Sequence, residues 1–431
     1  MSKKQALQTR ATAVELIDHV IRQRRSLDLE LAGHAALQRM DVRDRAFVRN
    51  LVATTLRRLG QIDALIDACL ARPLPRRAEM VRNFLRIGVC QLFFTEVAGH
   101  AAVSTAVELA KAAGHTAHVK LVNAVLRRLS REGAGLVADQ DAARLNTPTW
   151  LWDSWLRAYG PETCRQIATA HLSEAPLDIS VSGEPAHWAD VLQADVLPSG
   201  TLRRKAGGDV SAMPGFAAGQ WWVQDTAARM VAGLLGDVRG KRIIDLCAAP
   251  GGKTAYLASH GAQVTAVDRS GARLGRLREN LERLSLRAEI VTADATQWRP
   301  PELADAVLLD APCSATGTIR RHPDIIWNKS DADVQSLAAA QLRLLAAAAE
   351  MVKPGGTLVF ATCSLQPEEG HQQIDAVLSS GAALSLDLIE IEEAPGLAEV
   401  IDDQGMFRSL PCHLPNDGGM DGFFAARFFK L

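Results

Sequence analysis

The sequence predicts a multidomain fold: an all-α helical bundle, a small α/β unit and a C-terminal Rossmann-like α/β domain. The length of 431 residues exceeds a single typical core, so two or three domains are expected. Apolar residues recur at helical spacing over the first 140 residues, where strand patterns are scarce. From residue 221 onward strand and helix patterns alternate, which is typical of a parallel sheet with crossover helices. We therefore predict domains at 1–140, 141–220 and 221–431.

Charge is distributed unevenly along the chain, although the net charge is only −1. Residues 1–140 carry 22 Lys and Arg against 13 Asp and Glu, a net charge of +9, and the remainder carries −10. A basic part joined to an acidic part indicates a module that binds a polyanion, with plain solvated helix faces as the alternative. The hydrophobic content of 48% is typical of a soluble globular protein.

Cysteine usage and the N-terminal residues predict a reducing, cytoplasmic setting. None of the seven cysteines forms a C-x-x-C motif and no Cys/His cluster has metal-ligand spacing, so we predict free thiols and no metal site. The N-terminal residues are polar and lack the apolar segment of a signal peptide, and no run of 18 apolar residues is present. The sequence carries no signature of oligomeric state, and a monomer is the default expectation.

The first 140 residues contain three apolar stripes with arginines clustered between them. The stripes predict amphipathic helices that pack into a bundle, with breaks near 73–75, Gly99 and 114–115. Arginine matches the geometry of phosphate groups better than lysine does, which favours a polyanion partner. The stripes comprise Ala13, Leu16, Ile17, Val20 and Ile21; Leu51, Val52, Leu56 and Leu59; and Phe84, Leu85, Ile87, Val89, Leu92 and Phe93. Together with these features, the segments 85–88, 100–103 and 122–128 resemble the NusB-type RNA-binding helical domain.

Residues 141–220 predict a linker and a small mixed α/β unit. Helical patterns continue to about residue 172, and the alternating pattern of 176–182 then predicts a strand. A short helix and further short strands follow. The neighbouring Trp221 and Trp222 are expected to lie in the core rather than to stack on bases.

Five strands are predicted in residues 221–431, and three of them end in an acidic residue. The strands are 243–247, 264–268, 290–294, 306–310 and 357–361, and the acids are Asp268, Asp294 and Asp310. Because the carboxyl ends of parallel strands meet at one edge of a sheet, these carboxylates should line one rim.

The first of these strands runs into a loop of small residues, 247–254. Gly251 and Gly252 lack Cβ atoms, so the backbone there can adopt positive φ and approach a ligand closely. The helix that follows offers free N–H groups. A phosphate-binding P-loop would need a glycine at Cys247, and the dinucleotide motif G-x-G-x-x-G is absent, so a ligand turn of another kind or a plain tight turn remains.

The acids that follow this loop favour a nucleoside ligand. Asp268 lies about 20 residues after the loop, where a carboxylate can accept both ribose hydroxyls, and Asp294 should lie near the base edge. Since the dinucleotide motif is missing, S-adenosylmethionine is the best candidate. The predicted cofactor-binding residues are Cys247, Ala248, Ala249, Pro250, Gly251, Gly252, Lys253, Asp268, Asp294 and Asp310.

Two cysteines follow the last two predicted strands at the same rim. Cys313 lies in Asp310-Ala311-Pro312-Cys313, and Cys363 lies in Thr362-Cys363. Neighbouring parallel strands are about 4.8 Å apart, so both thiols can meet above one pocket. A buried pair of small apolar side chains is the alternative.

This combination resembles the RNA 5-methylcytosine methyltransferases, and with the NusB-like front it resembles the RsmB (Sun/Fmu) family that modifies 16S ribosomal RNA. The segments 320–324 and 421–424 also fit, although Gly370 stands where the family often has Asn. The resemblance implies an RNA-recognition-like unit in 141–220. There the strand end Ser180-Val181-Ser182 departs from the usual Arg-Val-Asn, which puts RNA contacts from this strand in doubt.

The resemblance also implies roles for individual residues. Cys363 would be the nucleophile that adds to C6 of cytosine, and Cys313 would act in release. Asp310, kept protonated in a dry pocket, would supply a proton or hydrogen bond to N3, and Lys253 would position the base or favour the thiolate. Arg320 and Arg321 are candidate RNA phosphate contacts.

Several alternatives stay open at this stage. The two cysteines have reversed roles in the DNA cytosine methyltransferases. A non-catalytic RNA-binding factor with a methyltransferase fold, and a P-loop NTPase, are the other classes. The expected partner is 16S ribosomal RNA before subunit assembly, with transfer RNA as the nearest alternative.

Overall fold

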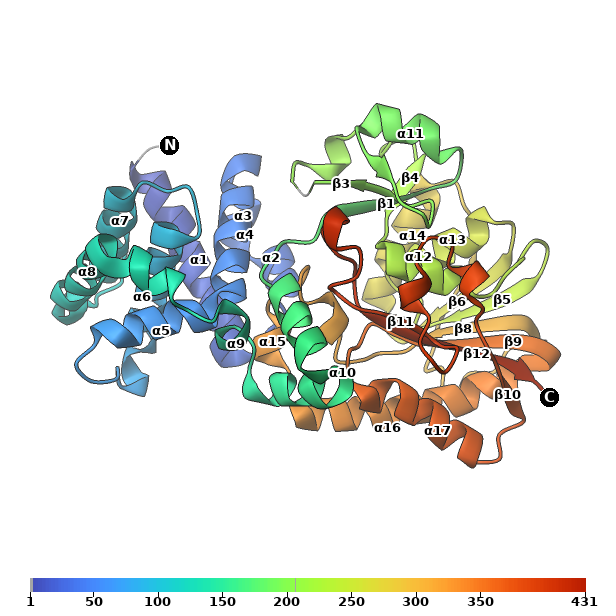
Figure 1. Ribbon diagram of the computed structural model, residues 1–431. Coiled ribbons are helices and arrows are strands. Elements are labelled where there is room, and N and C mark those ends of the chain that lie inside the picture. The colour runs from blue at the N-terminus through green and yellow to red at the C-terminus, as the bar shows by residue number, and fades with distance from the viewer. Residues whose placement is uncertain (1–2, 206) are drawn as a thin grey trace. The chain divides into compact units, whose positions relative to one another are not determined.

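The computed structural model describes residues 3–205 and 207–431, which form two compact units (Figure 1). Unit 1 extends to Ser173 and includes Arg321–Lys329, and unit 2 comprises Glu174–Arg320 and Ser330–Leu431. This division falls at 173/174 rather than at 140 and 220. The helical part of the predicted middle unit up to residue 173 therefore groups with the helical bundle, and its strands and the short helix between them group with the C-terminal domain. None of the helices in the described residues is long and apolar enough to cross a membrane.

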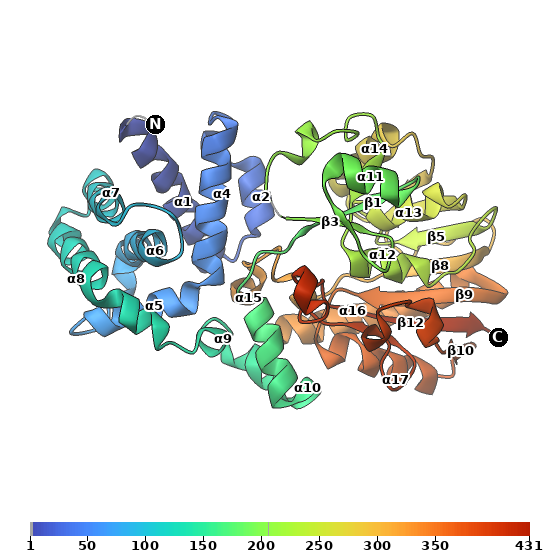
Figure 2. The same ribbon diagram turned by 45° about the horizontal axis from the view of Figure 1, so that its top comes forward.

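Unit 1 is a helical bundle, as predicted, with α6 packed against α1, α4, α5, α7 and α8 (Figure 2). The apolar stripes form its core, and Leu16, Ile17 and Val20 are fully buried. The predicted breaks coincide with the ends of helices. The α-helices of its first segment are α1 (Lys3–Gln23), α2 (Leu27–Gly33), α3 (Ala35–Gln38), α4 (Val42–Arg57), α5 (Leu59–Cys69), α6 (Glu79–Phe93), α7 (Gly99–Ala112), α8 (Val119–Ala138), α9 (Ala142–Leu145) and α10 (Thr149–Ala170), the last kinked at Gly160.

A short segment from the predicted C-terminal domain belongs to unit 1. It contains α15 (Ile325–Asn328), whose Trp327 Nε1 donates a hydrogen bond to the Leu56 carbonyl oxygen at 2.8 Å. The Leu27 amide donates to Asp324 Oδ2 at 3.0 Å, and Asp324 is buried. The segment thus satisfies a free amide at the start of α2.

Unit 2 contains a small antiparallel sheet in the order β2-β3-β1-β4. The strands are β1 (Leu177–Val181), β2 (Asp195–Val196), β3 (Leu202–Arg204) and β4 (Trp221–Val223), and α11 (Pro185–Leu192) lies between β1 and β2 in the chain. The predicted strand at 176–182 is β1. Trp221 and Trp222 are buried, which confirms their expected place in the core.

The second sheet of unit 2 has the order β10-β12-β9-β8-β5-β6-β7, with β11 paired to β12. Its strands are β5 (Arg242–Leu246), β6 (Gln263–Asp268), β7 (Glu289–Thr292), β8 (Ala304–Asp310), β9 (Val352–Thr362), β10 (Leu384–Asp387), β11 (Phe407–Ser409) and β12 (Phe423–Lys430). The first five are parallel and match the five predicted strands, whereas β12 is antiparallel to β9.

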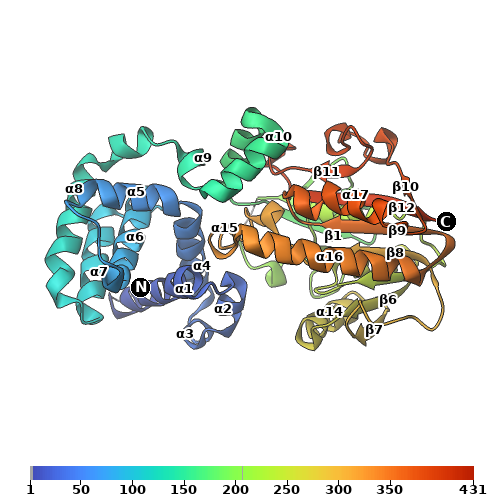
Figure 3. The same ribbon diagram turned by 90° about the horizontal axis from the view of Figure 1, so that it is seen from below.

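Helices cover both faces of this sheet, as expected for a Rossmann-like domain. On one face α16 (Asp331–Met351) and α17 (His371–Ser379) lie side by side (Figure 3). They pack on Ile244, Leu246 and Val307. The other face carries α12 (Thr226–Gly233), α13 (Gly252–Ser259) and α14 (Gly271–Arg283), of which α12 and α13 pack near Ile243 and Leu308. Successive side chains of a strand point to opposite faces of the sheet, and both faces are covered by helices. The strand sequences are therefore apolar at consecutive positions.

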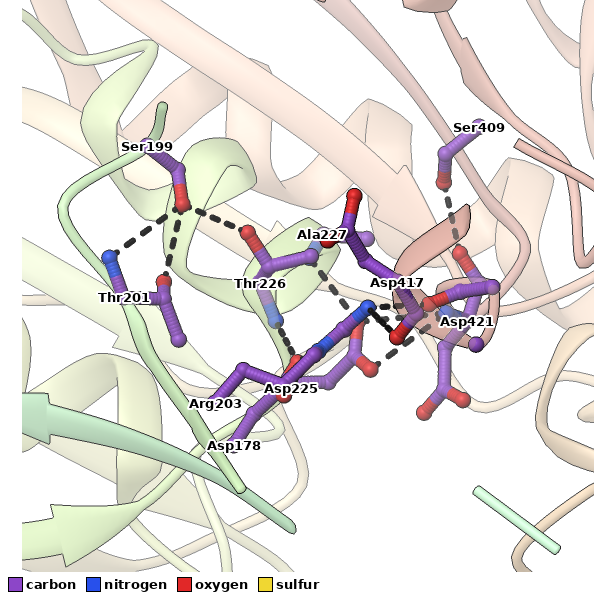
Figure 4. Close-up of polar contacts among 12 residues, drawn as sticks. Asp178, Ser199, Thr201, Arg203, Asp225, Thr226, Ala227, Ser409, Asp417 and Asp421 are labelled. Atoms are coloured by element: carbon purple, nitrogen blue, oxygen red, sulfur yellow. Dashed lines mark hydrogen bonds and ion pairs between the residues drawn. The ribbon is translucent and has the colours of Figure 1, made fainter. Parts of the chain in front are cut away.

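A buried ionic network joins the small sheet to the chain that precedes β12 (Figure 4). The Arg203 guanidinium donates to both Asp178 carboxylate oxygens at 2.7 Å, and its Nη1 donates to the Gly419 carbonyl oxygen at 2.5 Å. Asp178 Oδ2 also accepts the Thr226 amide at 3.0 Å. One carboxylate therefore fixes β1, β3 and the start of α12 relative to one another.

Candidate active site

The loop after β5 contains two residues with positive φ: Gly251, as the sequence predicts, and Cys247, which was not predicted, whereas Gly252 begins α13. Cys247 has φ +60°, and Gly251 caps α13 with φ +103°. A Cβ on Gly251 would lie 2.8 Å from Leu277 Cγ, so both the backbone angle and the packing of α14 require glycine. A Cβ on Gly252 would meet protein atoms no closer than 3.8 Å, so protein packing does not require glycine there.

A buried carboxyl, which the sequence reasoning did not single out, lies beneath this loop. Asp245 is fully buried, and its Oδ2 accepts the Thr254 hydroxyl at 2.6 Å. Its Oδ1 has no hydrogen-bond partner among the residues that the structure describes. Burial raises the pKa of Asp245 to about 7. The largely apolar run of β5 could have indicated that Asp245 is buried, but it gave no hint of the partner.

The three acids predicted at the rim lie at or just after the carboxyl ends of β6, β7 and β8, parallel strands of one sheet in which β5 separates β8 from β6. Asp268 is buried at the end of β6, where its carboxylate accepts the Ala249 amide at 3.3 Å and the Ser270 amide at 2.8 Å. It therefore lies directly beside the loop. Asp294 is exposed after β7, and hydrogen bonds from Thr296 lower its pKa. The cofactor contacts of both acids stay predictions.

Lys253 and Asp310 form an ion pair at the rim. Lys253 Nζ lies 2.7 Å from Asp310 Oδ2 and 4.9 Å from the centre of the Phe423 ring. Burial disfavours the charged lysine, but the Asp310 carboxylate outweighs burial and raises the pKa of Lys253, with a smaller contribution from Cys363. The Asp310 side chain is 30% exposed, so it does not lie in the dry pocket that the sequence analysis predicts, and its role stays a prediction. A P-loop role is disfavoured too, since the lysine is committed to this pair.

Cys313 and Cys363 meet as the strand order requires. Their sulfur atoms are 3.4 Å apart, because β8 and β9 are parallel neighbours with Asp310 opposite Ala361. Both are free thiols and half-buried. The hydrogen bond with Cys363 and burial raise the pKa of Cys313 well above its ordinary value. Burial also raises the pKa of Cys247, to about 12, which keeps that thiol protonated.

Backbone contacts hold the two cysteine loops together from the side of the C-terminal strand. The Gly317 amide donates to the Cys363 carbonyl oxygen at 3.0 Å, and the Gly422 amide donates to the Gly317 carbonyl oxygen at 2.8 Å. A Cβ on Gly317 would lie 1.9 Å from the Gly422 oxygen, so only glycine fits there. The segment 421–424, singled out in the sequence, thus supports the cysteine pair.

A buried glutamate whose role the sequence did not predict lies between the same loops. Glu369 is fully buried and accepts hydrogen bonds from Ser314 and Ser364, the residues that follow the two cysteines. Glu369 directly follows Glu368 in the sequence, and nothing in the local pattern distinguished it from that half-buried neighbour.

The two arginines predicted to contact RNA differ in placement. Arg320 is 1% exposed, its Nη1 donates to the Gly418 carbonyl oxygen, and its Nη2 pairs with Asp421 at 3.4 Å. A buried guanidinium with protein partners is not available to a phosphate, so the predicted RNA contact of Arg320 is not supported. Arg321 is half-buried, and its RNA contact stays a prediction.

Comparison with known proteins places this arrangement among ribosomal RNA methyltransferases. The family model described as 16S rRNA methyltransferase RsmB/F matches residues 232–429, and the NusB family model matches residues 7–131. Ribosomal RNA small subunit methyltransferase B of Klebsiella pneumoniae (strain 342) is 36% identical, with 99% of each chain covered. The protein of that name from Vibrio cholerae is also 36% identical, with 98% of each covered. The crystal structure of PH0851 shares the fold at a TM-score of 0.77 and 22% identity, covering 100% of this chain and 99% of that chain.

Proposed function

The chain belongs to the RsmB/F family of 16S rRNA methyltransferases, and on this premise we propose that it methylates C5 of a cytosine in 16S ribosomal RNA through a covalent adduct between a cysteine and C6. The observation that carries the proposal is the pair of thiols 3.4 Å apart next to the Lys253–Asp310 ion pair. Cytosine C5 is a poor nucleophile by itself, and addition of a thiolate to C6 is the chemical remedy for this.

S-adenosylmethionine is the cofactor, and when bound it supplies an electrophilic methyl group. Three features of the chain fit a nucleoside with a charged amino-acid tail. The loop 247–253 lies against the Asp268 carboxylate, α13 begins within that loop and so offers the amides of a helix start, and Asp245 Oδ1 has no hydrogen-bond partner within the described residues. We assign Asp268 to the ribose hydroxyls and Asp294 to the adenine edge.

Cys363 is the nucleophile in this proposal. Its thiolate forms the bond to C6, and the electron pair of the C5–C6 double bond moves towards C5 and N3. The Lys253 ammonium, whose charge interacts with Cys363, favours the thiolate. C5 then has the electron density needed to take the methyl group.

The Lys253–Asp310 pair supplies the hydrogen-bonding group that N3 needs. Because the carboxylate is already paired with an ammonium, the proton for N3 is held by the pair rather than by an isolated carboxylic acid. Asp310 lies at the end of β8, three residues before Cys313, so one strand end presents both groups.

Cys313 acts in the release step. After methylation a base takes the C5 proton, the electron pair of that C–H bond restores the C5–C6 double bond, and the Cys363–C6 bond breaks with its electron pair returning to the sulfur. A base buried in an RNA hairpin must be extruded to reach this site. The basic helices of unit 1 supply a surface for the RNA backbone. Action before subunit assembly, a monomeric state and a cytoplasmic setting are part of the proposal.

Substitution of each cysteine tests these roles. Cys363→Ser should abolish turnover, because a hydroxyl does not add to C6 at neutral pH. Cys313→Ser should trap a covalent RNA adduct, visible as a gel shift that survives denaturation. The opposite pattern would assign Cys313 as the nucleophile, as in the DNA enzymes, and preference for duplex DNA over RNA would move the protein to that class.

The target cytosine is found by bisulfite sequencing of total RNA from a strain that lacks the gene. Loss of one 16S rRNA signal, restored by the wild-type chain and not by Cys363→Ser, is the expected result. Loss of a transfer RNA signal instead would change the substrate. If the purified chain neither binds S-adenosylmethionine in calorimetry nor methylates RNA, a non-catalytic RNA-binding role replaces the proposal.

A further inference from the structure

Glu369 forms a buried junction between the two cysteine loops. Its Oε1 accepts the Ser314 amide at 2.8 Å and Gln341 Nε2 at 3.0 Å, and its Oε2 accepts the Ser364 hydroxyl at 2.5 Å and the Ser314 hydroxyl. Ser314 directly follows Cys313, and Ser364 directly follows Cys363. A single carboxylate is therefore bonded to the next residue after each thiol.

Four donors converge on this carboxylate, and a carboxylate suits them better than any neutral group. An ionised glutamate accepts only, with two oxygens and about four lone-pair positions. Gln341 also donates to the Pro312 carbonyl oxygen at 2.9 Å, so α16 is tied to the same loop. Burial raises the pKa of Glu369, and the hydrogen bonds from Ser314 and Ser364 oppose this rise.

Burial of the Glu369 carboxylate costs hydration free energy, so its hydrogen bonds must stabilise a particular conformation of the chain. A buried ion without a counter-ion is retained only where hydrogen bonds compensate its lost hydration. The hydrogen bonds described for Glu369 lead to the cysteine loops and to Gln341, and none joins it to a cation. The conformation that they stabilise is thus the close approach of the two loops.

We propose that Glu369 is a positioning residue for methyl transfer: its carboxylate holds the loops of Cys313 and Cys363 in register, so that both thiols reach the same base. This inference rests on the proposed covalent mechanism. Glu369 acts through Ser314 and Ser364 and does not itself touch the base. The expected consequence of its loss is a slower chemical step with unchanged binding of cofactor.

The experiment compares Glu369→Gln and Glu369→Ala with Glu368→Gln in the full chain. Glu368 is the matched control, because it is the preceding residue of the same turn and none of the described hydrogen bonds joins its carboxylate to a cysteine loop. Calorimetry with S-adenosylmethionine verifies folding of unit 2. Glu369→Gln keeps the shape of the side chain, so it decides the outcome should Glu369→Ala fail to fold.

Two readouts are needed, and only one depends on RNA chemistry. The first is the affinity for phenylarsine oxide, which condenses with two neighbouring thiols, forms two As–S bonds and releases one water; Cys313→Ser supplies the single-thiol baseline. The second is the single-turnover rate of methyl transfer to 16S rRNA at saturating RNA and cofactor. We expect Glu369→Gln to lose at least tenfold in both, with cofactor affinity within twofold of wild type.

Two outcomes would overturn the proposal. If both Glu369 variants match Glu368→Gln in arsenical affinity and in single-turnover rate, Glu369 does not position the thiols. A loss of arsenical affinity equal to that of cofactor affinity would indicate general destabilisation and would also refute it. The arsenical result stands even if the wild-type chain methylates a position other than C5, so failure of the proposed function remains distinguishable.

Discussion

Replacing Asp178 by asparagine should strongly destabilise unit 2. The side chains of Asp178 and Arg203 are 1% and 5% exposed and are joined by two hydrogen bonds of 2.7 Å. Asparagine keeps the shape but removes the negative charge, so the acceptors named for the buried guanidinium would then all be neutral: one amide oxygen and the backbone carbonyls. Removing one partner of a buried pair costs about 3–5 kcal/mol.

Because asparagine still accepts one hydrogen bond, we expect the lower end of this range, about 3 kcal/mol, for Asp178→Asn. Hydrogen exchange measured by mass spectrometry suits the question, since it reports unit 2 separately from unit 1. A loss of about 3 kcal/mol corresponds to faster exchange on the order of 100-fold in peptides from β1, β3 and β12.

Asp195 supplies a matched control for this experiment. It lies directly opposite Arg203 on β2, the other neighbour of β3, but it is exposed, and no ion pair to Arg203 is found among the described residues. Asp195→Asn should change stability by less than about 0.5 kcal/mol. The double variant Asp178→Asn/Arg203→Met should be no less stable than Asp178→Asn, because it leaves no buried charge. Equal exchange in Asp178→Asn and Asp195→Asn would refute the reasoning.

Two further predictions concern Lys253 at the rim of the sheet and Asp245, which is buried beneath the loop after β5. Lys253→Ala should lower the single-turnover methylation rate by about 100-fold with little change in cofactor affinity, because the pair with Asp310 would be lost. Reduced cofactor affinity with an unchanged rate of the chemical step would instead limit the lysine to cofactor binding. The Asp245 pKa is raised from 3.8 to about 7 in the folded chain, so this buried carboxyl lowers stability progressively as pH rises through that interval. The stability of Asp245→Asn relative to wild type should therefore rise by about 2–3 kcal/mol between pH 5 and pH 8. Hydrogen exchange of β5 peptides measures this difference, and a difference that stays constant over the pH range would contradict the pKa shift.

The sheet and the cysteine pair could be predicted because local patterns encode them. The strands before Asp268, Asp294 and Asp310 are short, largely apolar runs, and their acids fall at one edge because the strands are parallel. Cys313 and Cys363 follow neighbouring parallel strands, so their meeting at 3.4 Å follows from the strand order.

The interactions that sequence reasoning missed join residues far apart in the chain. Glu369 is 55 residues from Ser314, and Asp310 is 57 residues from Lys253. Arg320 was expected at the surface because arginines usually lie there, but its partner Asp421 is 101 residues away and buries it. Local pattern reveals which residues are polar, whereas burial and partners depend on the tertiary fold.

The central claim is that Cys363 forms the covalent bond to cytosine. The most direct measurement is tandem mass spectrometry of the trapped complex between Cys313→Ser and 16S rRNA after digestion with nuclease and trypsin. We predict a cytidine nucleotide, carrying the added methyl group, on the peptide that contains Cys363. A nucleotide on another cysteine of the chain, or no covalent adduct while C5 methylation proceeds, would contradict the account.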